Sequence, residues 1–205
     1  PTHDLRPLMK ADPNVKLFDW NPLGNQYTFR PNHTTKPFDN PKIRQALWYA
    51  LNQKDFLDAA IGNPDYYKEC KALFVCGSPL ASTKGMDDKL TSNVTKAREI
   101  LKEAGYDGTP VLLMHSTDLA VLTTLATVAQ SLMEKAGVKV DMQSMDWQTL
   151  VARRSKKDPS NAGGWSAFIT SWVAADVTNP VSAAYVNSAC DKASFGWPCD
   201  ETMEK

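Results

Sequence analysis

The sequence predicts an α/β fold in which a mixed, mostly parallel sheet is flanked by helices. Residues 110–172 alternate strand, helix, strand, helix and strand, an order typical of parallel strands joined by crossover helices. The length of 205 residues allows one large domain or two small ones, and we find no repeat or linker that would divide it. Hydrophobic residues make up 42% of the chain and charged residues 22%, a composition that excludes disorder.

The N-terminal third is expected to begin with a helix and a hairpin and to continue with helices. Proline ends the first helix, and a polar cap before a proline at the first helical position starts the next one. The elements expected here are a helix at 2–12, strands at 15–18 and 27–30 joined by a turn at 21–25, a helix beginning at Pro41, and a helical piece that stops at Gly62.

The remainder of the chain changes from an irregular stretch to a regular pattern. Residues 63–91 carry many loop formers and are expected to be irregular. The continuous apolar strand at 111–114 is typical of a strand covered on both faces, whereas the alternating strand at 138–142 is half-buried. The other elements expected are a helix at 94–104 capped by Ser92, a helix at 119–136, a helix around 147–151, a strand at 167–171, and a helix start at 200–204.

The four cysteines form two local pairs, Cys70 with Cys76 and Cys190 with Cys199. Four cysteines allow three pairings, and the two short-range bonds close small loops with little rearrangement. A structural zinc site would need tight CxxC or Cys/His spacing, which is absent. The spacing therefore predicts two disulfides and an oxidising compartment, with free buried thiols as the alternative.

Charge and motifs exclude several classes of function. The formal net charge is zero, so we expect no nucleic-acid partner. No apolar run approaches the roughly 20 residues that span a bilayer, so we expect no direct membrane insertion. His3, His33 and His115 are far apart, and HExxH, GxSxG and GxGxxG motifs are absent. We therefore expect no metal site, no cofactor and no enzyme, although a secreted enzyme remains an alternative.

Aromatic and polar residues gather where the last predicted strand ends. Trp165, Trp172 and Trp197 lie within the last forty-one residues, and Asp176 and Asn179 follow Trp172. Ligands of open α/β sheets bind beyond the carboxyl ends of the strands. An indole there offers a flat apolar wall, and a carboxylate pairs with an ammonium group. The alternative is that the tryptophans are core residues and that Asp176 caps the turn at Asn179.

The segment NHTTKPFDNPKIRQAL at 32–47 resembles a signature of the extracellular solute-binding proteins of the peptide/nickel class. Those proteins are the periplasmic receptors of ABC importers. Three further segments resemble the family in the same order, namely 96–106, 136–140 and 167–180. Residues 195–198 and the Cys70/Cys76 pair also resemble a branch of the family whose loops carry disulfides.

The resemblance implies a lobe of the periplasmic binding protein type II kind. Such receptors have two α/β lobes that close over the ligand, and residues 1–205 match the second lobe as a single domain. We expect the first lobe to be absent from this chain and the C-terminal end to be truncated. The implied function is to bind dipeptides or oligopeptides in the periplasm, or at the cell surface through a lipid anchor, and to deliver them to a membrane permease. Opines, sugars and metal chelates are the alternative solutes.

The resemblance also implies ligand-binding residues. Trp172 matches a tryptophan at the strand end, after which an aspartate holds the α-amino group of a peptide. The corresponding residue here is Asp176, four residues after Trp172 rather than three. Asn179 stands where many members have an aspartate before proline, and Arg30 falls where relatives present a ligand-facing polar residue. We expect these four residues, together with Trp165, to form the ligand-binding set.

Overall fold

The computed structural model describes residues 5–18 and 20–204. His3 and the first residues of the helix expected at 2–12 lie outside this range. Within it, the helices and strands are α1 (Arg6–Ala11), β1 (Asn25–Pro31), α2 (Pro41–Ala50), α3 (Gln53–Ala60), α4 (Val94–Glu103), β2 (Val111–Ser116), α5 (Ala120–Lys135), β3 (Val140–Met145), α6 (Trp147–Arg153) and β4 (Ala167–Val173).

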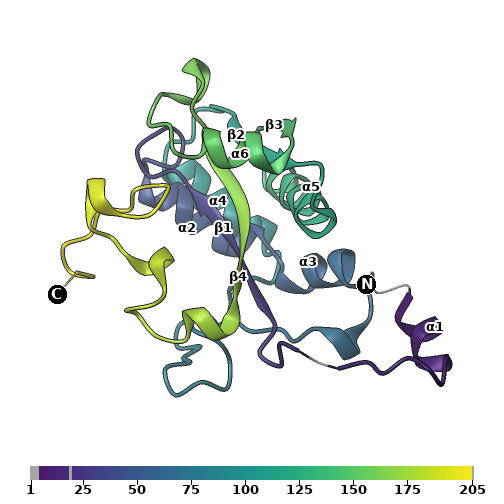
Figure 1. The fold of residues 1–205 in the computed structure, drawn as a ribbon. Coiled ribbons are helices and arrows are strands. Elements are labelled where there is room, and N and C mark those ends of the chain that lie inside the picture. The colour runs from purple at the N-terminus through teal and green to yellow at the C-terminus, as the bar shows by residue number, and fades with distance from the viewer. Residues whose placement is uncertain (1–4, 19, 205) are drawn as a thin grey trace.

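One four-stranded sheet, with the strand order β1-β4-β2-β3, organises the molecule. β2 pairs in parallel with both β3 and β4, whereas β1 pairs antiparallel with β4. The prediction that the three strands near 111–114, 138–142 and 167–171 share a sheet is therefore confirmed. Because these three strands are parallel, their carboxyl ends lie at the same edge of the sheet. β4 crosses the middle of the molecule beside β1 (Figure 1).

The sheet is covered on both faces by apolar side chains. On one face α2, α4 and α5 pack against the sheet around Phe38, Leu113 and Met133. The side chains of these three residues are fully buried. The opposite face is covered by α6 and by the C-terminal loop that carries Trp197. Every residue of β2 is buried: the apolar run at 111–114, as the sequence predicts, and also the polar residues His115 and Ser116.

Local signals explain where the helices begin. The side chain of Asn40 accepts a hydrogen bond from the backbone N–H of Lys42, and Pro41 is the first residue of α2, as the sequence predicts. The cap of α4 differs from the prediction. Asn93 rather than Ser92 accepts the capping bond, from Lys96 N at 3.1 Å, and Ser92 has a φ of +57° that places it before the helix.

Two expected elements do not form. Residues 15–18 contain no strand, and Phe18 is 81% exposed. The prediction of an N-terminal hairpin was therefore wrong. β1 instead finds its partner in β4, with Asn25 opposite Val173 and Pro31 opposite Ala167. Residues 201–204 form turns rather than a helix, and the Asp200 carboxylate accepts from the backbone N–H groups of Thr202 and Met203.

Candidate ligand-binding site

The candidate site lies at the carboxyl end of β4. The strand ends at Val173, and a short 3₁₀ turn, Ala174–Val177, follows it. The backbone N–H of Ala174 donates to Gly24 O at 3.0 Å, which ties the strand end to the start of β1. Trp172, Asp176 and Asn179 therefore all lie at the edge of the sheet where the sequence predicts a ligand.

Trp172 is half-buried and held on two sides. Its indole Nε1–H donates to Thr28 Oγ1 at 3.2 Å. The ring of Tyr185 meets it edge to face, with 5.7 Å between the ring centroids. Val177 and Ala183 belong to the same apolar cluster. The indole is thus fixed in one orientation while part of it stays accessible, which suits a rigid wall of a binding site.

Asp176 lies in the turn after β4 and is exposed. Within the described residues, no hydrogen bond or ion pair engages its carboxylate. The alternative that Asp176 caps the following turn finds no support, because Asn179 performs that task with its own side chain. The Asn179 Oδ1 accepts from Val181 N at 3.0 Å and from Ser182 N at 3.2 Å. Asp176 therefore presents an exposed carboxylate in the turn directly after β4, whereas Asn179 shapes the loop.

Arg30 has partners other than a solute. Its guanidinium donates to three backbone carbonyls, those of Tyr185 at 2.8 Å, Phe195 at 2.9 Å and Ser194 at 3.5 Å. Burial lowers the pKa of Arg30 from its ordinary value. These bonds fasten the C-terminal loop to β1, so Arg30 acts on the candidate site by holding Tyr185 beneath Trp172.

Trp165 is not brought together with Trp172. It precedes β4 at the opposite end of the strand and is 0% exposed. Its Nε1–H donates to Arg154 O at 3.1 Å, and its ring packs against Phe168 and Trp197. The structure thus assigns Trp165 to the core, as the alternative for the tryptophans anticipates.

Sequence reasoning missed three contributors to the site, Gln26, Leu73 and Tyr185. The carbonyl of Leu73 accepts from Gln26 Nε2 at 2.9 Å and from the Tyr185 hydroxyl at 3.0 Å. The same hydroxyl lies 3.2 Å from Gln26 Oε1, and burial raises the pKa of Tyr185. Strand alternation is a usable signal for Gln26, because it lies opposite Trp172 in the antiparallel pair.

Both predicted disulfides form. Cys70 bonds to Cys76 and Cys190 bonds to Cys199, and no cysteine remains free. The first bond closes the loop that contains Leu73. The second closes the loop whose carbonyls Arg30 holds. The first disulfide therefore closes a loop that contacts Tyr185, and the second closes a loop that shares Arg30 with Tyr185.

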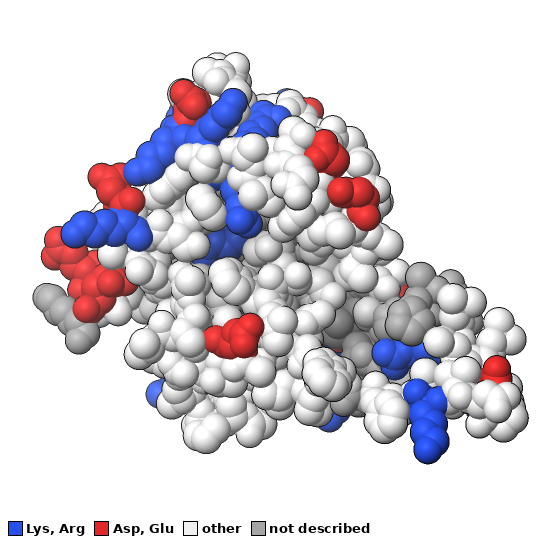
Figure 2. Space-filling model, viewed as in Figure 1, with Lys and Arg blue, Asp and Glu red and all other residues white. Residues whose placement is uncertain are grey.

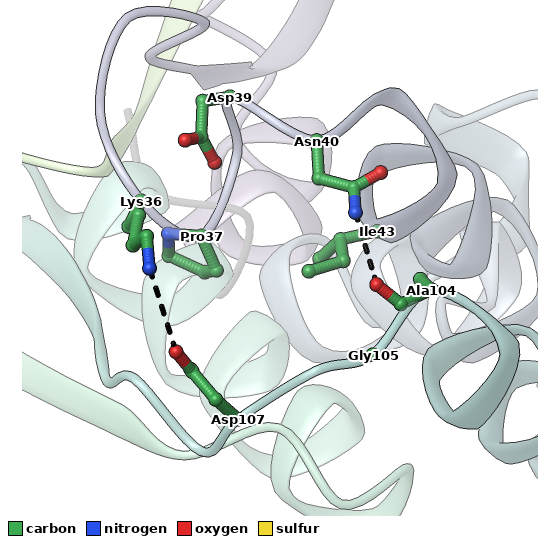
Figure 3. Close-up of a pocket in the computed structure, with 8 residues that line it drawn as sticks. All are labelled: Lys36, Pro37, Asp39, Asn40, Ile43, Ala104, Gly105 and Asp107. Atoms are coloured by element: carbon green, nitrogen blue, oxygen red, sulfur yellow. Dashed lines mark hydrogen bonds and ion pairs between the residues drawn. The ribbon is translucent and has the colours of Figure 1, made fainter.

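A separate hollow of about 230 Å³ lies where α2 begins and α4 ends (Figure 3). Asn40 Nδ2 donates to Ala104 O at 3.1 Å across it. Lys36 and Asp107 form an ion pair at 3.7 Å with both side chains more than half exposed, an arrangement that contributes little. None of the predicted ligand-binding residues lines this hollow. The hydrogen bond from Asn40 to Ala104 connects the start of α2 to the end of α4.

The lower central part of the face shown in Figure 2, near the lower end of β4, carries one patch of Asp or Glu surrounded by uncharged side chains. Many of the Lys and Arg side chains of this face lie toward the upper left, away from that end of the strand. Among residues 5–18 and 20–204, no three His, Cys, Asp or Glu side chains gather as a metal site would require. In the same ranges, no helix has the length and apolar character needed to cross a bilayer.

Comparison of the sequence with known families and proteins gives consistent matches. Residues 1–195 match the profile described as bacterial extracellular solute-binding proteins, family 5 Middle. A probable peptide ABC transporter periplasmic-binding protein, y4tO of Sinorhizobium fredii, is 36% identical over 100% of this chain and 39% of its own length. The glutathione-binding protein GsiB of Salmonella typhimurium is 32% identical over 78% of this chain and 31% of its own length. The chain thus spans about two fifths or less of these relatives.

Solved structures confirm the predicted fold class. The substrate-binding protein CtaP of Listeria monocytogenes superposes with a TM-score of 0.77 at 18% identity, covering 96% of this chain and 38% of CtaP. DppA of Helicobacter pylori in complex with the peptide STSA gives 0.65 at 21% identity, covering 90% of this chain and 34% of DppA. At such identities the likeness shows the fold, which is that of a type II periplasmic binding protein lobe.

Proposed function

The chain belongs to the bacterial extracellular solute-binding proteins of family 5, and on that premise we propose that it forms part of a peptide receptor. The receptor would bind dipeptides or oligopeptides in the periplasm and deliver them to the membrane permease of an ABC importer. The observation that carries this proposal is the pair of side chains at the carboxyl end of β4: the indole of Trp172 is held in place, and the turn that follows carries the Asp176 carboxylate, which has no partner among the described residues. The relative from Sinorhizobium fredii, which matches the whole chain, is named as such a receptor.

The chemistry of these two side chains suits a peptide. A carboxylate pairs with the α-ammonium group through a charge-assisted hydrogen bond, which is stronger than a bond between neutral groups. The indole offers an apolar surface on which an adjacent side chain or peptide plane packs. Both groups serve binding, and the named relatives are likewise binding proteins.

We also propose that this chain is the second of two lobes. Its share of the relatives' length, 39% for the protein from Sinorhizobium fredii, leaves room for another lobe. Phe18 is 81% exposed and Trp20 is 95% exposed, and large apolar side chains left open in this way are typical of a surface that another part of a protein covers. The solute would then be enclosed between the two lobes.

Calorimetry on the full-length protein tests the proposed function. Peptides of two to five residues are titrated beside glutathione, a nickel–histidine complex, an opine and a sugar. We expect a peptide to bind with a dissociation constant of about 1 μM and to raise the melting temperature, because a ligand stabilises the state that binds it. Binding of one of the other solutes, with no response to any peptide, would overturn the proposal.

A further inference from the structure

The loop closed by the Cys70–Cys76 disulfide lies directly against the candidate site. Two side chains hold its centre, since the Leu73 carbonyl accepts from both Gln26 and Tyr185. The next residue, Phe74, packs on the cluster that contains Trp172 and Tyr185. In Figure 1 this segment runs just below the lower end of β4. The disulfide and the two hydrogen bonds therefore fix the loop as one wall of the site.

The side chain of Leu73 is unusual within this pinned loop. Its neighbours Ala72 and Val75 are 6% and 9% exposed, but Leu73 itself is 51% exposed. A loop held in place by its backbone thus presents one large apolar side chain to solvent. Leu73 therefore offers an exposed apolar side chain directly before Phe74, which packs on the cluster that contains Trp172.

We propose that Leu73 determines specificity by contacting an apolar side chain of the bound peptide, and that the Cys70–Cys76 loop positions it. This inference rests on the proposed function and narrows the substrate class to peptides with a large apolar side chain near the amino end. A fixed apolar wall discriminates by the area that the ligand side chain buries against it. Because the loop is already ordered, binding costs little additional conformational entropy there.

The test compares Leu73→Ala with Leu80→Ala in the full-length protein. Leu80 is a matched control, since it is 49% exposed on the same irregular segment and belongs to none of the apolar clusters among the described residues. We expect Leu73→Ala to lower the affinity for peptides with Leu or Phe side chains by about tenfold. The affinity for Ala peptides of equal length should fall by less than about twofold. Leu80→Ala should leave both series unchanged.

Tyr185→Phe tests the positioning of the loop. This variant keeps the ring against Trp172 and removes only the hydroxyl that donates to the Leu73 carbonyl. We expect the ratio of affinities for Leu and Ala peptides to fall by about threefold, a change that general destabilisation would not produce because it affects both peptides alike. An unchanged ratio would show that the hydroxyl does not position Leu73.

The outcomes separate this inference from the proposed function. If the wild-type protein binds peptides and Leu73→Ala behaves as Leu80→Ala does, the role of Leu73 is overturned while the peptide receptor stands. If the wild-type protein binds glutathione, a sugar or the nickel–histidine complex and no peptide, both proposals fall together. Selective loss of the Leu and Phe series in Leu73→Ala alone supports both.

Discussion

Alternate residues on one face of β1 hold the candidate site together. Gln26 donates to the Leu73 carbonyl, Thr28 accepts from the Trp172 indole, and Arg30 fastens the loop that carries Tyr185. Residues two apart in a strand face the same side of a sheet, so a single short strand reaches all three segments. The partners of Arg30 lie 155 to 165 residues away in sequence. Individual polar contacts thus fix segments that the chain order alone leaves far apart.

Replacement of Asp176 by Asn tests the role of the carboxylate in the full-length protein. The substitution removes the negative charge but keeps the size of an exposed side chain. We expect peptide affinity to fall by roughly 10-fold to 100-fold, the range for a hydrogen bond to a charged group. Calorimetry measures the change. Asp87→Asn, which alters an exposed carboxylate in an irregular segment, is the control, and equal affinities for the two variants would make Asp176 a turn residue.

The lowered pKa of His33 predicts that the free energy of unfolding falls on acidification. Burial, with smaller contributions from Arg44 and Arg30, lowers its pKa from the ordinary 6.5 to about 4. The unfolded chain therefore binds more protons than the folded chain between pH 6.5 and 4, and stability falls as the pH falls through that window. After allowance for partial exposure, His33 should account for about 1–2 kcal/mol of the loss.

Urea unfolding of wild type and His33→Gln between pH 7.5 and 4 measures this contribution. The difference in unfolding free energy between the two proteins should change across the window, because only the wild type carries the titrating ring. Carboxylates contribute to both proteins equally and cancel in the difference. A pH-independent difference would show that His33 does not titrate in this way.

At the scale of elements, the sequence predicts the regular part of the fold well. The apolar runs at β2 and β4 and the long periodic pattern at α5 are strong local signals, so that local pattern and tertiary structure agree. The hairpin at 15–30 was wrong because a strand partner is chosen by packing over the whole sheet. β1 pairs with β4, 148 residues away at Asn25 and Val173, and no local signal marks that choice.

The candidate site was predictable only in part for a related reason. Trp172 and Asp176 follow a strand end, which periodicity locates. Arg30 instead bonds to backbone carbonyls more than 150 residues away, and Trp165 packs against the distant ring of Trp197. Leu73 sits in an irregular loop where no period exists, and only the flanking cysteines distinguish it.

Gly196 should be indispensable to the docking of the C-terminal loop on β1. Its φ is +103°, and a Cβ there would lie 2.5 Å from Pro31 O. We expect Gly196→Ala to destabilise the protein by about 3 kcal/mol or more, since the clash adds to backbone strain of about 1–2 kcal/mol. Gly77→Ala is the control, because its φ of +90° imposes the strain while nothing lies within 4 Å. Thermal unfolding of both variants gives the comparison, and equal losses would exclude a clash.

At the scale of the whole molecule, this chain alone should fold without retaining peptide affinity. If this chain is one of two lobes, as proposed, it supplies part of the contacts and no enclosure, yet the cost of immobilising the ligand remains. If the complete receptor has a dissociation constant of about 1 μM, one lobe alone should have a dissociation constant of about 1 mM or more. Circular dichroism checks folding, and calorimetry checks binding. Micromolar binding by residues 1–205 would place the complete site in this lobe.

The pairing of β1 with β4 has a consequence for the time course of folding. β1 ends at Pro31, but the strand that completes its hydrogen bonds begins only at Ala167. Contacts of such large sequence separation form late, because a long loop must close first. β1 therefore has no sheet partner until β4 is in place. Its backbone amides should gain protection from hydrogen exchange after those of β2 and β3.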